Sequence, residues 1–151
     1  MTTAWNDFEH QAPHLADHVR DRIQEHGLAL LATLAADGSP RISGIEAVFH
    51  GDHLWLAMMP DSVKGRDLRR DGRLALHNAT IDKDVTHGDV KIHGVAVGAD
   101  DRDQPGTPDV GGDAELFHVD LTRVASIRVD TDHLVIRTWR PGQAVRTLTR
   151  S

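Results

Sequence analysis

The residues best suited to chemistry lie in one stretch, Met58 to Arg73, between two strand-like runs. Asp61 or Ser62 can cap a short helix, and the first turn of such a helix presents free backbone N–H groups beside the Lys64 ammonium. From Lys64 to Arg73, five cationic side chains stand against two aspartates, in a chain whose net charge is −6. The pattern predicts an anion-binding site, and the alternative is a solvated helix face of the same composition.

Histidines are the second group of residues that could do chemistry, and the chain has eleven of them. His10, His14 and His18 recur every four residues, so a helix would place the last two on one face with the reach of a metal-binding pair. No carboxylate completes a His-Glu-x-x-His pattern, and exposed helical histidines need no ligand. We therefore predict no metal site. The absence of cysteine excludes disulfides, thiolate-bound metals and thiol nucleophiles.

Length and composition indicate one domain that spans residues 1–151, because 39% hydrophobic residues suffice for a single core. Residues 1–12 form a polar N-terminal extension, and residues 100–113, rich in Asp, Pro and Gly, form an exposed loop. The spacing of Leu15, Val19 and Ile23 predicts an amphipathic helix that begins at Pro13 and ends before Gly27.

Strand-like patterns fill most of the remaining chain. The segments are residues 28–34, 41–49, 54–58, 74–80, 89–99, 116–119, 124–129, 134–139 and 144–148. Asp37-Gly38 predicts a hairpin turn, and Gly94 within a long strand predicts a bulge or a close backbone approach. Two helices and these strand-like segments, joined mostly by hairpins, predict a mainly β fold, an antiparallel barrel that is closed or nearly closed.

The charge and hydropathy patterns limit the partners that the chain can have. A pI near 5.9 disfavours nucleic acid, because the phosphate backbone would meet an acidic surface. No run approaches the ~20 apolar residues of a membrane span, and the first residues lack the pattern of a secretion signal. We expect a cytoplasmic protein.

The order of several motifs resembles the pyridoxamine 5′-phosphate oxidase-like family, whose actinobacterial branches include flavin- and deazaflavin-dependent reductases. The motifs are residues 31–34 and 37–41, Leu54-Trp55-Leu56, Ser62-Val63-Lys64, and residues 67–77. The match runs from about Leu28 to Gly98 and more loosely to Trp139. The resemblance implies a split barrel of six to seven strands, with an N-terminal helix and a short helix after the third strand. It also implies a homodimer with a cofactor groove at each side of the interface.

The resemblance also assigns site residues. It implies that Ser62 and Lys64 bind the cofactor phosphate, and that Ala57 and Met58 lie along the ribityl chain and ring. The remaining residues that it implies at the cofactor are Ser43, Gly44 and Ile45 in the groove wall, Asp89 near the pyrimidine edge, and Trp139 with Arg146 or Arg150 from the partner subunit.

Departures from the family pattern decide which activity to expect. Ser43, Val48 and Val63 stand where tight FMN binders usually carry basic residues, and Arg41 could replace one of them from the same strand face. The Arg-x-His pair of the true oxidase is absent, since Arg146-Thr147-Leu148 has no histidine. We therefore expect no pyridoxamine phosphate oxidase activity, and we expect the deazaflavin coenzyme F420 to bind at least as well as FMN.

Two functions fit these expectations. The first is an FMN- or F420-dependent oxidoreductase that moves a hydride between the cofactor and a small organic substrate, with the chemistry supplied by the cofactor. No catalytic side chain is assigned, although His77 or His93 could donate a proton if they are not simply packed strand histidines. The second is a non-catalytic carrier of FMN, deazaflavin or haem.

Overall fold

The computed structural model describes all residues 1–151. The elements are α1 (Trp5–Gln11), α2 (Pro13–Gln24), β1 (Leu28–Leu34), β2 (Pro40–His50), β3 (His53–Met58), α3 (Val63–Arg70), β4 (Arg73–Asn78), β5 (Asp89–Gly98), β6 (Glu115–Asp130), β7 (His133–Trp139) and β8 (Arg146–Arg150). None of the helices combines the length and apolar character needed to span a membrane.

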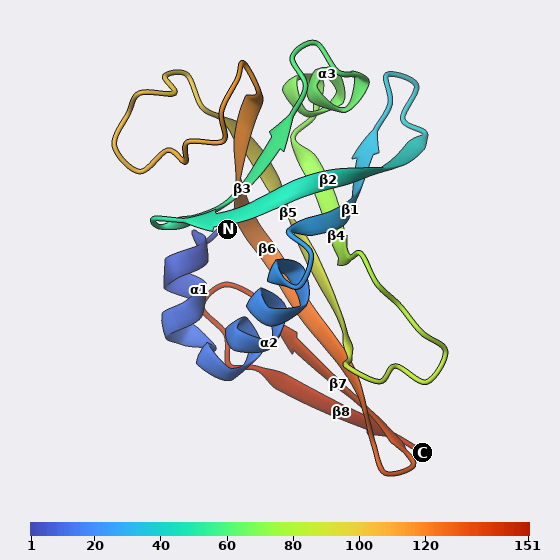
Figure 1. Cartoon of the computed structure of the whole chain (residues 1–151). Helices are drawn as coiled ribbons and strands as arrows, with labels where there is room; N and C mark the ends of the chain where they lie inside the picture. The colour runs from blue at the N-terminus through green and yellow to red at the C-terminus, as the bar shows by residue number, and fades with distance from the viewer.

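The strands form one antiparallel sheet in the order β3-β2-β1-β4-β5-β6-β7-β8, and a further β3–β6 pairing closes the first six into a barrel (Figure 1). The length of β6 makes this arrangement possible. Its first residues pair with β3, while residues 124–130 pair with β7, which carries β8 away from the barrel. The predicted mainly β split barrel is confirmed, although the two strands expected within residues 116–129 are one continuous strand.

Gly94 causes the irregularity that the sequence indicated. The pairing of β5 with β6 shifts register between His93 and Gly94. A Cβ atom at Gly94 would lie 2.5 Å from the backbone oxygen of Asp120, so no other residue fits there without moving the backbone.

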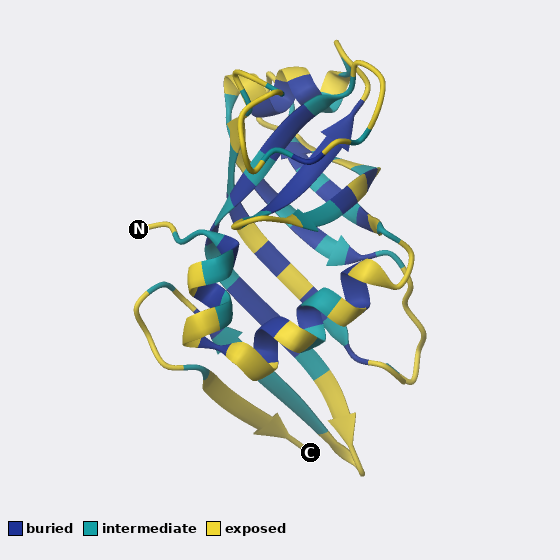
Figure 2. Cartoon of the chain, turned by 60° about the vertical axis from the view of Figure 1, so that its left-hand side comes forward, coloured by how far each residue is buried: buried dark blue, intermediate teal, exposed yellow.

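The polar N-terminal lead contains a helix that sequence analysis did not predict. Trp5 and Phe8 lie on one face of α1 and are fully buried, with Trp5 against Phe49 and Phe8 against Trp139. The predicted helix α2 buries Leu15, Val19 and Ile23 in the same core. Figure 2 shows that α1 and α2 turn their buried faces toward the sheet and cover one side of it. The N-terminal lead therefore contributes Trp5, Phe8 and Ala12 to the core.

Candidate functional site

The helix α3 follows β3 and lies at the end of the barrel away from α1 and α2 (Figure 1). Ser62 caps it, because its Oγ accepts a hydrogen bond from the backbone N–H of Gly65 at 3.1 Å. Helix geometry leaves the N–H groups of Val63 and Lys64 without an intrahelical acceptor. The beginning of α3 therefore offers backbone donors and the Lys64 ammonium together, as the sequence predicted.

A buried carboxylate fixes α3 against the barrel. Asp67 accepts hydrogen bonds from Oγ1 of Thr33 on β1 at 2.7 Å, Nε of Arg41 on β2 at 2.7 Å, and Arg70 at 2.8 Å. Burial alone would raise the pKa of Asp67, but the hydrogen bonds from Arg41, Thr33 and Arg70 outweigh it and lower the pKa to about 2. The carboxylate stays ionised at neutral pH and holds three elements together.

Most of the cationic side chains on and after α3 are paired with carboxylates of the same chain. Arg70 pairs with Asp67, Arg69 with Glu115, and Arg73 with Asp71. Lys64 and Arg66 form no ion pair. The broad cationic surface expected from the sequence is thus reduced to two free cations.

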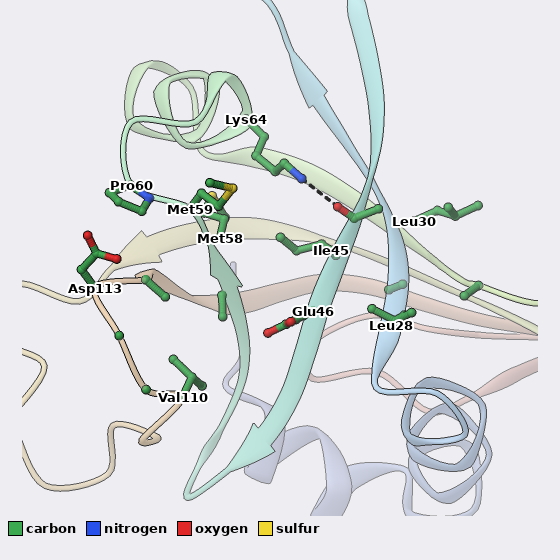
Figure 3. A pocket seen from close by; sticks show the side chains of 17 residues that line it. Leu28, Leu30, Ile45, Glu46, Met58, Met59, Pro60, Lys64, Val110 and Asp113 are labelled. Atoms are coloured by element: carbon green, nitrogen blue, oxygen red, sulfur yellow. Dashed lines mark hydrogen bonds between the residues drawn. The ribbon is translucent and has the colours of Figure 1, made fainter.

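A groove of about 560 Å³ runs along the outer face of β2 and β3 below the beginning of α3 (Figure 3). Its walls come from β1, β2, β3, the start of α3, and the segment 110–114. The lining residues are Leu28, Ala29, Leu30, Gly44, Ile45, Glu46, Ala57, Met58, Met59, Pro60, Lys64, Ala79, Val110, Gly111, Gly112, Asp113 and Ala114. The groove is largely apolar and open to solvent along its length.

Charge in the groove is confined to three side chains. Lys64 reaches across the gap and donates from Nζ to the backbone oxygen of Gly44 at 2.7 Å (Figure 3). Glu46 and Asp113 are the acidic lining residues, and no histidine lines the groove. The arrangement can hold a flat apolar molecule with an anionic group at the Lys64 end.

Comparison with known families identifies this architecture. The model of the family described as pyridoxamine 5′-phosphate oxidase matches residues 15–137. The chain belongs to this family. A comparison with curated protein sequences finds no significant match.

Solved structures of other proteins in this fold confirm the architecture. PhzG from Burkholderia lata, in complex with tetrahydrophenazine-1-carboxylic acid, has a TM-score of 0.64 and 13% identity over 97% of this chain and 92% of its own. A pyridoxamine 5′-phosphate oxidase-related, FMN-binding protein from Nostoc punctiforme has a TM-score of 0.64 and 11% identity over 93% and 96%. A haem-binding protein from Mycobacterium smegmatis has a TM-score of 0.60 and 18% identity, and the match covers 89% of this chain but 57% of that protein.

The structure of this pyridoxamine 5′-phosphate oxidase family member brings together five of the residues assigned from the sequence. Gly44, Ile45, Ala57, Met58 and Lys64 all line the groove. Whether they contact a cofactor is still a prediction. The family resemblance indicated all five, and the place of Lys64 at the start of a short helix indicated it independently.

Three further candidates lie near the groove without lining it. Ser62 is occupied as the cap of α3 through its accepting oxygen, although its hydroxyl hydrogen can still be donated. Ser43 precedes Gly44 on β2, so its side chain points to the opposite face of the strand, and it does not line the groove. Arg41 donates its Nε to Asp67, so it is not a free cation, and its role as a substitute phosphate donor stays a prediction.

Trp139 does not lie where the family resemblance placed it. It is fully buried, packs on Phe8 and donates from its indole nitrogen to Oε1 of Gln11 at 3.2 Å. The pairing of Trp139 with Val124 turns the indole toward α1. The expectation that it reaches the groove of a second subunit is therefore wrong, because core packing leaves none of its surface available.

Asp89 and Arg146 also lie away from the groove of the same chain. Asp89 begins β5, with one carboxylate oxygen 3.5 Å from the amide nitrogen of Asn78. Arg146 lines a separate cavity of about 490 Å³ on the β7–β8 side, which it shares with Arg123, Arg140 and Arg150. Arg146 can meet a groove only if that groove belongs to another subunit.

The two histidines considered as proton donors line a shallow pocket next to the groove. His77 and His93 share this pocket with Ile42, and Leu30 separates it from the groove. Nδ1 of His77 lies within hydrogen-bond distance, 2.8 Å, of the Asn78 backbone oxygen. Desolvation, followed by the charges of Arg123 and Lys91, lowers the pKa of His93. Neither side chain reaches the groove of its own subunit.

Several groove residues were not found by sequence analysis. Glu46 and Leu28 lie on the outer face of their strands, and the two-residue period of β1 and β2 could have indicated them. Segment 110–114 had no such signal, because it belongs to a stretch that reads as an exposed loop. Most of residues 100–113 are exposed, but Val110 packs against the small cluster of Trp55, Ala57 and Leu116 and lines one side of the groove.

Proposed function

We propose that the chain is an oxidoreductase that binds FMN or the deazaflavin F420 in the groove and moves a hydride between this cofactor and a small organic substrate. The observation that carries the proposal is the position of Lys64 at the start of α3 and at one end of an apolar groove. Its ammonium has no ion-pair partner and donates only to the Gly44 backbone oxygen, and the chain belongs to the pyridoxamine 5′-phosphate oxidase family. The Nostoc relative is described as FMN-binding, which supports a flavin-type ligand.

The residues present fit such a cofactor. Leu28, Leu30, Ile45 and Met58 offer apolar walls for a flat ring system, and Lys64 with the first N–H groups of α3 offers donors for one anionic group. The bound cofactor would supply the hydride chemistry, and the protein supplies position and exclusion of water. Glu46 and Asp113 oppose a second negative charge in the groove.

The donor set favours the deazaflavin over FMN in this proposal. A compact phosphate dianion is held best by several converging donors. Here Lys64 is the one cation in the groove, because Arg41 is paired with Asp67 and Ser43 lies outside the lining. A cofactor whose negative charge extends along a tail could place part of it near the exposed Arg66.

The proposal includes a homodimer. Ile42 is 71% exposed and Leu28 is 45% exposed on the outer face of β1 and β2, beside the shallow pocket of His77 and His93. A second copy covering this face would bury these side chains and could bring Arg146 to the partner's groove.

A non-catalytic carrier is the second candidate. Most of the residues that line the groove are small or apolar, and they do not indicate a particular substrate. Of the carried ligands considered, haem is disfavoured, because its usual histidine ligand is missing from the lining and only the thioethers of Met58 and Met59 are present. Reduction of bound cofactor and its reoxidation by a substrate would establish catalysis, whereas retention without turnover would establish a carrier.

Matched alanine variants test the cofactor site. Lys64→Ala is expected to weaken cofactor binding by about 1–3 kcal/mol, the scale of a lost charge-assisted hydrogen bond. Arg66→Ala is the control for FMN, because Arg66 is the neighbouring cation on α3 without an ion pair and does not line the groove. Equal affinities for Lys64→Ala and the parent would contradict the site.

A further inference from the structure

Three side chains that could bind a metal meet on the outer face of β3 and β6, beyond the groove. His53 begins β3, and His118 and Asp120 lie on β6. Residues two apart on a strand share a face, so His118 and Asp120 point the same way. Trp55 pairs with His118 across the two strands, which brings His53 beside them. The strand register itself therefore assembles the cluster.

The three side chains bring possible metal-binding atoms close together and leave their hydrogen bonds incomplete. One ring nitrogen from each histidine and one oxygen of Asp120 lie within 4.8 Å of one another. The His53 and His118 rings stack with centroids 3.9 Å apart, and Nδ1 of His118 is 3.3 Å from Oδ1 of Asp120. Nδ1 of His53 is buried without a hydrogen-bond partner, and Nδ1 of His118 is buried with no partner beyond this contact to Asp120. Buried polar atoms are rarely left in this state, so each calls for an explanation.

We propose that His53, His118 and Asp120 bind a divalent transition metal ion of the zinc type. Imidazole nitrogens with one carboxylate suit zinc and its neighbours, whereas Mg²⁺ and Ca²⁺ prefer sites made of oxygen. Ligand atoms around a tetrahedral zinc lie roughly 3–3.5 Å apart, so side-chain rotation must close the present spacing. Three protein ligands leave a fourth position for water or another small ligand.

The indole of Trp55 provides a local reporter. Its ring centroid lies 5.8 Å from that of His53 and 5.3 Å from that of His118, in edge-on contacts. The other two tryptophans, Trp5 and Trp139, lie in the core under α1. A paramagnetic ion such as Co²⁺ bound at the cluster is expected to quench Trp55, and Trp55→Phe should remove that part of the quenching.

The test uses full-length protein dialysed against a chelator and then titrated with Zn²⁺, by calorimetry or by competition with a coloured chelator. We expect one equivalent to bind, at least tenfold more weakly in His53→Gln, His118→Gln and Asp120→Asn. Asp120→Asn keeps the shape of the side chain, and circular dichroism checks that each variant folds. Mg²⁺ is expected not to compete.

Two variants serve as matched controls. His133→Gln removes an exposed histidine that also lies 3.3 Å from a neighbouring carboxylate, that of Asp132. His14→Ala removes one of the two histidines, His14 and His18, that lie four residues apart on α2. Both are expected to bind Zn²⁺ as the parent does. Unchanged Zn²⁺ binding in folded Asp120→Asn and His118→Gln, or loss of binding in His14→Ala, would overturn the proposal. The cluster would then be a stacked histidine pair beside a carboxylate that binds no metal.

Discussion

Nε of Arg41 lies 2.7 Å from Oδ2 of Asp67, inside the junction between β2 and α3. The same carboxylate accepts a hydrogen bond from Thr33 on β1. Arg41 therefore ties β2 to the helix whose first turn carries Lys64. The stability of α3, and the placement of Lys64 at the groove, should depend on this buried carboxylate.

The first prediction is that Asp67→Asn lowers the free energy of unfolding by about 1–3 kcal/mol, because a buried charged acceptor of three hydrogen bonds is lost. Urea denaturation measures the change. Asp71→Asn is the control, since Asp71 pairs with Arg73 at the surface, where solvent screening leaves such a pair little effect on stability. Equal effects of the two substitutions would show that Asp67 does not anchor α3.

The second prediction concerns acid stability. Since the pKa of Asp67 falls from 3.8 to about 2 on folding, its contribution is complete above about pH 4 and is lost as the pH falls toward 2. The unfolding free energy of the parent should decrease in this window more steeply than that of Asp67→Asn. Denaturation curves at several pH values between 2 and 5 test this, and parallel pH profiles would contradict it.

The barrel was predictable from the sequence because its strands have a clear two-residue period and hairpin turns such as Asp37-Gly38. The groove residues on β2 and β3 came from the family resemblance, since neighbours such as Gly44 and Ile45 point to opposite faces of a strand and alternation cannot select both. The state of the cations was not predictable, because Arg69 finds Glu115 and Arg41 finds Asp67 only after the chain folds. Local charge counts cannot include partners from distant strands.

The buried position of Trp139 could not be predicted from the sequence either. Its place near the C-terminus matched a family residue, but the short helix α1 covers it in this chain. Trp5 and Phe8, which form the buried face of α1, lie in a lead that is otherwise polar and too short to show a helical period.

The third prediction separates a core role for Trp139 from a cofactor role. Trp139→Phe is expected to lower the free energy of unfolding by about 1–3 kcal/mol, because it loses packing volume and the hydrogen bond to Gln11. Cofactor affinity should stay within twofold of the parent. Thermal denaturation and a binding titration on the same sample measure both effects, and weaker binding with unchanged stability would restore the role implied by the resemblance.

The fourth prediction tests the backbone contact at the bulge. Gly94→Ala is expected to destabilise the protein by about 1–3 kcal/mol, since the added methyl group would meet the Asp120 backbone oxygen. Gly98→Ala on the same strand is the control, because the nearest atom to its Cβ is an ordinary 3.7 Å away. Comparable stabilities of the two variants would show that the strands can separate at no cost.

The fifth prediction is a dimer in solution, with about twice the 16.6 kDa mass of the chain. Ile42→Lys should shift the mass measured by light scattering toward that of the monomer, because it places a charge on the proposed interface. Val129→Lys is the control, since Val129 is an exposed apolar residue at the β6–β7 end of the sheet. A monomeric parent at micromolar concentration would contradict the proposed assembly.

Titration of cofactor-free protein with FMN and, separately, with F420, followed by the fluorescence of each cofactor, tests the central claim most directly. We expect F420 to bind at least as tightly as FMN, and both to lose about 10- to 100-fold in affinity in Lys64→Ala. Arg66→Ala should leave FMN affinity unchanged and should weaken F420 binding less than Lys64→Ala does. Nanomolar FMN binding without detectable F420 binding would contradict the proposed preference. Binding of neither cofactor would contradict the assignment of the groove.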